Sequence, residues 1–228
     1  DVLRVRSYDV IGVSCLFPSR TGIHAAIELV HKLQPRARIV LGGPFATVMA
    51  DRFLENPAVA AVAIGEAEST VPKLMEVLAG GGDLSGVKGI AFRSTDGQIV
   101  HTPRQEFIQD LDSLPFPAFH LYDLRSYRRF WPGNFNVVRQ FIYDHTVGAR
   151  WAAVLTTRSC DFHCEFCAVH ITNGDRARSR SGRNVADEFQ YLHDRFGYRH
   201  VFLQDAAFPI GSPLCNDLCH NLIDRKLR

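Results

Sequence analysis

The stretch RSCDFHCEFC, residues 158–167, places three of the chain's six cysteines within eight positions. They are Cys160, Cys164 and Cys167, in the spacing Cys-x3-Cys-x2-Cys. A disulfide would leave one thiol over, and a structural zinc site needs a fourth ligand and usually paired Cys-x2-Cys units. Three thiolates suit a four-iron cluster with one open iron, because soft sulfur ligands favour iron–sulfur clusters. The spacing therefore favours a cluster, with zinc as the main alternative.

The composition is that of an ordinary globular protein, with 46% hydrophobic and 22% charged residues among 228. A net charge of +2 gives no reason to expect a nucleic-acid partner. No apolar run reaches about 18 residues, so no membrane span is expected, and residues 1–4 lack the pattern of a signal peptide. Six cysteines in a chain of this length do not indicate a disulfide scaffold, which favours the reducing cytoplasm.

The first hundred residues alternate between short apolar runs and segments with helical spacing of apolar residues. The expected strands are residues 9–14, 39–41 and 59–64, and the expected helices are residues 23–33, 47–54 and 71–78. This alternation predicts a parallel α/β sheet. Residues 89–102 then form two short apolar runs around Asp96-Gly97, which is a hairpin signal.

Residues 103–150 are rich in proline and weakly periodic, so they predict a connector with short helices at most. The alternation then resumes, with expected strands at residues 152–155 and 201–203 and expected helices at residues 184–196 and 214–223. Asn184 is the predicted N-cap of the first of these helices, and Gly197 its end. Cys215 and Cys219 lie one turn apart in the last helix, either as a pair on one face or as buried small residues. The predicted organisation is a domain at residues 1–102, a connector at 103–150 and a second domain at 151–228.

The cysteine motif, with an aromatic residue before its last cysteine and a predicted strand before its first, resembles the radical S-adenosylmethionine (SAM) superfamily. The resemblance implies that Cys160, Cys164 and Cys167 hold a 4Fe-4S cluster whose open iron chelates SAM. The reduced cluster would cleave SAM to methionine and a 5′-deoxyadenosyl radical, and Phe166 would lie near the adenine. Asp205 follows the next strand, where the family often has Gly-Gly-Glu, so the resemblance suggests that it contacts the SAM amino group. A helix cap or a turn carboxylate is the alternative role for Asp205.

The predicted strands of the first domain end in polar and small residues, where open parallel sheets bind their ligands. The segments VIGVS, IVLGGPFAT and AIGEAEST, followed by the connector LDSLPFPAF, resemble the cobalamin-binding domain that is joined to many radical SAM enzymes. By this resemblance Ser14, Gly42, Gly43, Gly65 and Glu66 would line the cobalamin. The sequence contains no DxHxxG motif, so it suggests no axial histidine.

The implied fold is a Rossmann-like parallel-sheet cobalamin-binding domain that lacks its first strand, followed by the first βα units of a partial radical SAM (β/α) barrel. The implied protein is a cobalamin-dependent radical SAM enzyme, present as a partial chain that is not expected to be active alone. The favoured reaction is methyl transfer to an unreactive carbon or phosphorus centre, on a small-molecule substrate and with an external electron donor of flavodoxin or ferredoxin type. Oxidative cyclisation or ring rearrangement is the alternative reaction, and a non-catalytic cobalamin- or metal-binding module is the alternative of another class. A methylthiotransferase would need further cysteines in the first domain, which has only Cys15.

Overall fold

The computed structural model describes residues 2–122 and 151–227. The chain forms two compact units, each of which is discontinuous in sequence. Unit 1 comprises Asp1–Ile108 and Phe162–Asp175, and unit 2 comprises Gln109–Asp161 and Arg176–Arg228. Of the predicted connector, residues 123–150 lie outside the described residues. Its described part contains only two short 3-10 turns, η3 (Leu111–Ser113) and η4 (Phe119–Leu121).

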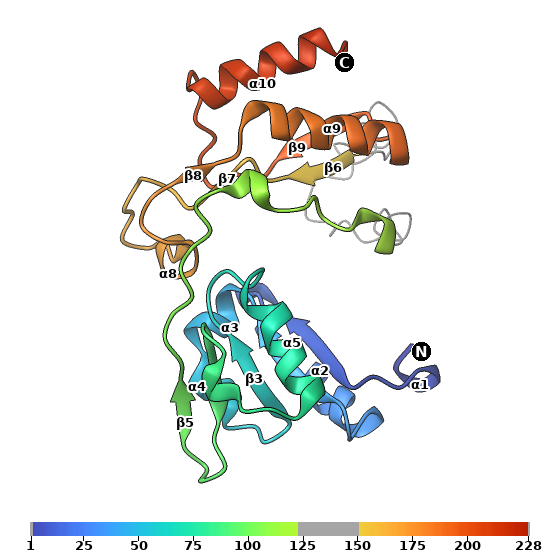
Figure 1. The fold of residues 1–228 in the computed structure, drawn as a ribbon, viewed down its shortest axis with the longest axis vertical. Coiled ribbons are helices and arrows are strands. Elements are labelled where there is room, and N and C mark those ends of the chain that lie inside the picture. Colours follow the sequence, from blue (N-terminus) through green and yellow to red (C-terminus); the bar gives the residue numbers. More distant parts are fainter. Residues whose placement is uncertain (1, 123–150, 228) are drawn as a thin grey trace. The chain divides into compact units, whose positions relative to one another are not determined.

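Unit 1 is built on a five-stranded sheet in the order β1-β2-β3-β4-β5 (Figure 1). Its strands are β1 (Val10–Ser14), β2 (Arg38–Gly42), β3 (Val59–Ala63), β4 (Ile90–Arg93) and β5 (Ile99–His101). The first three strands are parallel, whereas β4 and β5 are antiparallel and form the predicted hairpin. Gly97 adopts a positive φ of 87° in its turn, which glycine tolerates without a steric cost. The predicted parallel strands and the hairpin are therefore confirmed, and the hairpin extends the same sheet.

Helices cover both faces of this sheet. Successive side chains of β2 point to opposite faces, and they are buried on both. Ile39 and Leu41 pack with α2 (Arg20–Leu33), α3 (Pro44–Val48) and α4 (Ala50–Leu54), while Val40 packs with α5 (Thr70–Gly80). Short elements complete the unit: α1 (Val2–Val5), η1 (Phe17–Ser19), η2 (Leu84–Gly86) and α8 (Val169–Asn173). The prediction of one helix over residues 47–54 was wrong, because the chain forms two short helices joined at Met49.

Unit 2 contains two separate strand pairs. The strands β6 (Trp151–Val154) and β9 (His200–Leu203) are parallel, and β7 (Thr157–Arg158) and β8 (Arg178–Ser179) are antiparallel. Two helices, α9 (Gly182–Phe196) and α10 (Pro213–Asp224), pack against each other and share one core with β6 (Figure 1). Its buried members are Ala152, Val154, Val185, Ala186, Leu192, Leu214 and Leu218. In the described ranges, no helix is long and apolar enough to span a membrane.

The N-cap of α9 is Ser181, so the prediction of Asn184 was wrong by three residues. The Ser181 hydroxyl accepts a hydrogen bond from the backbone N–H of Asn184 at 3.1 Å. Asn184 is thus the third residue of the helix, and its side-chain oxygen accepts a hydrogen bond from Arg180 instead. The other end is as predicted, because Gly197 adopts a left-handed φ of 67° and stops the helix.

Gly182 lies where α9 meets α10, and a Cβ atom at this position would lie 2.2 Å from the backbone nitrogen of Leu218. Because backbone atoms cannot rotate away, Gly182→Ala is expected to lower the free energy of unfolding by about 1–3 kcal/mol. Gly22→Ala is the matched control, since Gly22 lies inside α2 with nothing within 4 Å of the added Cβ. Denaturant titrations followed by circular dichroism measure both variants. A Gly182→Ala protein as stable as the wild type would contradict the close contact.

Cys15 is fully buried, and burial raises the pKa of its thiol, although a hydrogen bond to the Gly42 backbone opposes the rise. A raised pKa lowers the thiolate fraction at any given pH, and the thiolate is the form that reacts. In the metal-free native protein, we expect iodoacetamide to label exposed Cys219 at least ~10 times faster than Cys15. Peptide mass spectrometry gives both rates, and labelling in denaturant is the control in which the difference should vanish. Equal rates in the native protein would show that Cys15 is not protected.

Candidate functional site

The cysteine motif lies in the segment that follows β7. All three cysteines have free thiols; Cys160 is half-buried, and Cys164 and Cys167 are exposed. Cys160 belongs to unit 2, whereas Cys164 and Cys167 belong to unit 1. Within unit 1 a turn joins the last two, because the Cys167 N–H donates to the carbonyl oxygen of Cys164 at 3.0 Å. Free thiols are the donors that an iron–sulfur cluster requires, so the donor set fits that group.

The side chains around the motif differ in their exposure and in their contacts. Phe166 is 92% exposed, so its predicted contact with adenine stays a prediction. His163 stacks on His170 with ring centroids 4.4 Å apart, and Nε2 of His170 lies 2.9 Å from the carbonyl oxygen of Phe162. In the part of the chain that the structure describes, Nδ1 of His170 is buried without a hydrogen-bond partner. Among residues 2–122 and 151–227, no three His, Cys, Asp or Glu side chains converge to hold a metal ion.

Two strand ends of unit 1 bring the predicted residues Ser14, Gly42 and Gly43 together. Ser14 pairs with Gly42 in the parallel register of β1 and β2. Gly43 has a φ of 94°, and a Cβ atom there would lie 2.9 Å from the Cys15 carbonyl oxygen and 3.4 Å from the Ser14 hydroxyl oxygen. Only glycine fits this conformation without strain, so the chain turns tightly over the edge of the sheet.

The third strand end joins this edge through a residue that the sequence did not single out. Thr47 in α3 accepts a hydrogen bond at its hydroxyl oxygen from the Gly65 N–H at 3.0 Å. Gly65 has a positive φ of 76°. Glu66 is oriented differently, since its Oε2 accepts a hydrogen bond from the Ile108 N–H at 3.0 Å. Gly65 therefore lies beside the β2–α3 turn, while Glu66 anchors the chain that leaves the hairpin.

Asp205 lies beyond the end of β9, and its carboxylate accepts four hydrogen bonds from two threonines. The donors are the backbone N–H and hydroxyl groups of Thr156 and Thr157, at distances of 2.6–3.0 Å. An ionised carboxylate has about four acceptor positions. Three of the four bonds end on Oδ1 and one on Oδ2, so Oδ2 keeps an acceptor position. The predicted contact with the SAM amino group stays a prediction.

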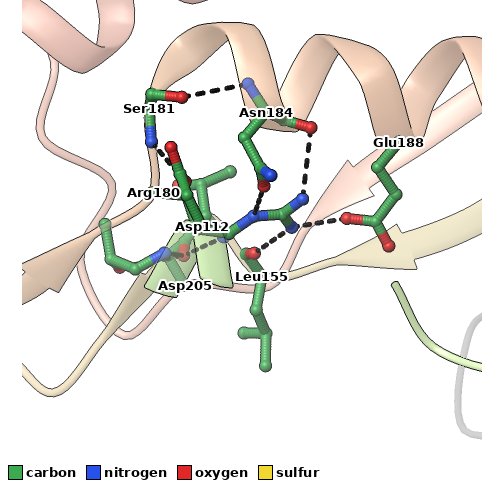
Figure 2. Close-up of polar contacts among 9 residues, drawn as sticks. Asp112, Leu155, Arg180, Ser181, Asn184, Glu188 and Asp205 are labelled. Carbon is green, nitrogen blue, oxygen red and sulfur yellow. Dashed lines mark hydrogen bonds and ion pairs between the residues drawn. The ribbon is translucent and has the colours of Figure 1, made fainter. Parts of the chain in front are cut away.

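Arg180 binds the backbone next to these threonines, at the Leu155 carbonyl oxygen. This residue was not identified from the sequence. Figure 2 shows its guanidinium between Leu155, Asn184 and Glu188. Glu188 is only 1% exposed, and its carboxylate forms an ion pair with Arg180. A signal for this pair was present, because Glu188 lies on the apolar stripe of α9 between Val185 and Leu192. A charged residue on a buried helix face needs a buried partner.

The other two cysteines, which were predicted to pair on one face or to be buried, are not joined by a disulfide. Cys215 is half-buried and Cys219 is exposed, both on α10. The two thiols are free, as in the rest of the described chain.

Residues 1–75 match the B12 binding domain family. Over 93% of its length, the chain is 29% identical to cytidylyl-2-hydroxyethylphosphonate methyltransferase of Streptomyces wedmorensis, and it spans 41% of that protein. It is 31% identical over 83% of its length to the anaerobic magnesium-protoporphyrin IX monomethyl ester cyclase of a Synechocystis species, and it spans 34% of that protein. The chain thus spans well under half of these relatives.

Two solved structures share the fold over nearly the whole chain. The radical SAM methyltransferase TsrM from Kitasatospora setae has a TM-score of 0.71 and 18% identity, with 98% of this chain and 42% of TsrM covered. The cobalamin-dependent SAM radical enzyme OxsB has the same TM-score and 19% identity, with 99% of this chain and 30% of OxsB covered. These likenesses confirm the predicted fold: a Rossmann-like B12-binding domain followed by βα units of the radical SAM barrel. Residues 1–75 are thus similar to the B12 binding domain family, and nearly the whole chain shares the fold of these two SAM radical enzymes.

Proposed function

We propose that the protein is a cobalamin-dependent radical SAM enzyme that transfers a methyl group to an unreactive carbon or phosphorus centre. The observation that carries the proposal is three free thiols in Cys-x3-Cys-x2-Cys spacing in the segment that follows β6 and β7, in a chain whose residues 1–75 match a B12-binding family. The methyltransferases among its relatives favour methyl transfer. We assign cobalamin binding to residues 1–102, a connector to residues 103–150 and the radical chemistry to residues 151–228.

In this proposal Cys160, Cys164 and Cys167 hold a 4Fe-4S cluster through their thiolates. When bound, the cluster supplies the electron that cleaves SAM to methionine and a 5′-deoxyadenosyl radical. Phe166 offers an exposed ring against which the adenine can stack. Asp205 is the predicted partner of the SAM amino group. An external donor of flavodoxin or ferredoxin type would reduce the cluster, and a small molecule would be the substrate.

Cobalamin is assigned to the edge of the sheet formed by Ser14, Gly42, Gly43 and Gly65. Glycine backbone allows the close approach of a large flat ligand, and the Ser14 hydroxyl can donate a hydrogen bond to it. Glu66 was predicted to belong to this set as well. Its bond to the Ile108 N–H suggests that it acts by holding the connector beside the site.

Oxidative cyclisation is the second candidate reaction. The chain is 31% identical to an anaerobic magnesium-protoporphyrin IX monomethyl ester cyclase over 83% of its length, which keeps this reaction class open. The two reactions differ in the fate of the methyl group of SAM. Transfer of an isotope-labelled methyl group into a product supports methylation, whereas 5′-deoxyadenosine formation without methyl transfer favours cyclisation.

Replacing any one motif cysteine is expected to abolish SAM cleavage, because two thiolates do not hold a four-iron cluster stably. The full protein is reconstituted anaerobically with iron, sulfide and cobalamin, and iron content and 5′-deoxyadenosine are measured for Cys160→Ala, Cys164→Ala and Cys167→Ala. Cys219→Ala removes an exposed thiol outside the motif and is the control that should retain both. Normal cleavage by a motif variant would refute the ligand assignment, and wild-type protein that retains only zinc would refute the cluster.

Gly43→Ala is expected to weaken cobalamin binding at least ~10-fold, since a side chain at a φ of 94° costs about 1–3 kcal/mol and displaces the turn. Absorbance titrations with hydroxocobalamin give the dissociation constant, and circular dichroism verifies that the sheet is retained. Gly12→Ala is the control, because Gly12 lies in β1 with nothing within 4 Å of the added Cβ. Wild-type affinity in folded Gly43→Ala protein would place the cobalamin elsewhere.

A further inference from the structure

Asp205 and Arg180 bind consecutive backbone polar groups in the segment that joins β6 to β7. Asp205 accepts from the N–H groups of Thr156 and Thr157, at 2.8 and 2.6 Å. Arg180 donates through its guanidinium to the Leu155 carbonyl oxygen at 3.0 Å, and through its backbone N–H to the Thr156 carbonyl oxygen at 2.9 Å. Consecutive N–H and C=O groups of residues 155–157 are thus fixed from two sides.

Asp205 binds these residues more tightly than a neutral turn would. Its two oxygens also accept from the hydroxyl groups of Thr156 and Thr157, at 3.0 and 2.8 Å. Both threonines are at most 4% exposed. Hydrogen bonds to an ionised acceptor are stronger than neutral ones, and little water competes for them at a buried position. The charge of Asp205 is therefore used to join the end of β9 to the segment that leads to the cysteine motif.

Arg180 is itself held rigidly, so it can act as a fixed support. Its Nε donates to the Asn184 side-chain oxygen at 2.6 Å, and its charge is paired with buried Glu188 (Figure 2). Its guanidinium also lies over the ring of Phe116, 5.6 Å from the centroid. The side chain is only 12% exposed. Such a guanidinium has few alternative positions, and the carbonyl groups that it binds share this restriction.

The chain then reaches the first cysteine through a strained residue. Ser159, between β7 and Cys160, is 2% exposed and has a φ of 67°. A residue other than glycine keeps this left-handed conformation only where the surrounding structure enforces it. Only Arg158 and Ser159 separate Thr157 from Cys160, so a displacement of Thr157 is transmitted to the thiol.

We propose that Asp205 and Arg180 form a clamp on residues 155–157 that sets the position of Cys160 before the cluster binds. Both are positioning residues, and neither has to touch the cluster or SAM. The proposal rests on the proposed function for the identity of the ligand. It differs from the predicted role of Asp205, because it assigns the carboxylate to the protein backbone and not to the SAM amino group.

The test is Asp205→Asn in the full protein, with Asp187→Asn as the matched control. Asn keeps the size but loses the charge and replaces one acceptor oxygen with a donor. Asp187 lies on α9 of the same unit and pairs with Arg225, at the end of α10, at 2.7 Å. Two properties are measured: the rate at which iodoacetamide labels Cys160 relative to Cys219 in metal-free protein, and the iron content with the electron paramagnetic resonance spectrum after reconstitution.

If the clamp exists, iodoacetamide should label Cys160 of the Asp205→Asn protein several-fold faster relative to Cys219. The reconstituted variant should contain at most about half of the wild-type iron, and the electron paramagnetic resonance spectrum of its reduced cluster should be broader. Asp187→Asn should match the wild type. If Asp205→Asn does not fold, Thr157→Val, which removes one of the four bonds, should shift Cys160 labelling in the same direction by a smaller amount.

Two results would overturn the clamp. One is wild-type Cys160 labelling, iron content and spectrum in folded Asp205→Asn. The other is a wild-type cluster with weakened SAM binding, which would assign Asp205 to SAM directly. Failure of the proposed function is distinguishable, because wild-type protein would then bind no cluster, while Cys160 labelling in metal-free protein would still test the clamp.

Discussion

Parallel pairing of strands brings together, in both units, residues that lie far apart in sequence. In unit 1 the register of β1 and β2 places Ser14 against Gly42. In unit 2 the register of β6 and β9 continues past the strands, because the Gln204 N–H donates to the Val154 carbonyl oxygen at 3.0 Å. This contact brings Asp205 beside Thr156. Since parallel strands end at the same edge of a sheet, the loops that follow them share that edge and can build a site.

The two units fix these loops by different means. Unit 1 uses glycine: Gly43 and Gly65 adopt positive φ values that allow the backbone to turn closely over the edge. Unit 2 uses charge: half-buried Asp205, and half-buried Arg180 paired with buried Glu188, bind the backbone between β6 and β7. Glycine adds no side chain at these turns, which suits the close approach of a large ligand. The charged groups of unit 2 hold a short segment rigidly, which suits a thiol that has to meet other thiols around one cluster.

The buried charges make unit 2 sensitive to single changes. Glu188 is almost fully buried, and removing its partner would leave an uncompensated charge in the core of α9. Breaking such a pair typically costs about 3–5 kcal/mol. Buried ion pairs often add little net stability over apolar residues of the same size, but this pair fixes the direction of the Arg180 guanidinium. The Leu155 carbonyl oxygen and the Asn184 side chain depend on that direction.

Most elements could be predicted from the sequence, and the failures have local physical causes. Residues 47–54 have helical spacing, but Met49 has a ψ of 26° and interrupts the helix. Ser181 and Asn184 are both good capping residues three positions apart, and the choice between them depends on Arg180, which engages the Asn184 side chain. Glu188 stands out as a charge on an apolar stripe, but its partner precedes the helix and could not be identified by helical spacing. Thr47 carries no sequence signal, because its hydroxyl gains a role only when Gly65 lies beside it.

The sequence by itself determined the main alternation of strands and helices, the hairpin, the cysteine spacing and the resemblance to a family, because these depend on local periodicity, turn residues and short motifs. The tertiary structure alone decided what the charged and polar residues contact. From the sequence alone, Asp205 could be a ligand residue or a turn carboxylate. Only the register of β9 against β6 brings it to two buried threonines, which lie 48 and 49 positions away in the sequence. Hydrogen bonds act over about 3 Å in space whatever the separation along the chain, so local patterns do not encode such partners.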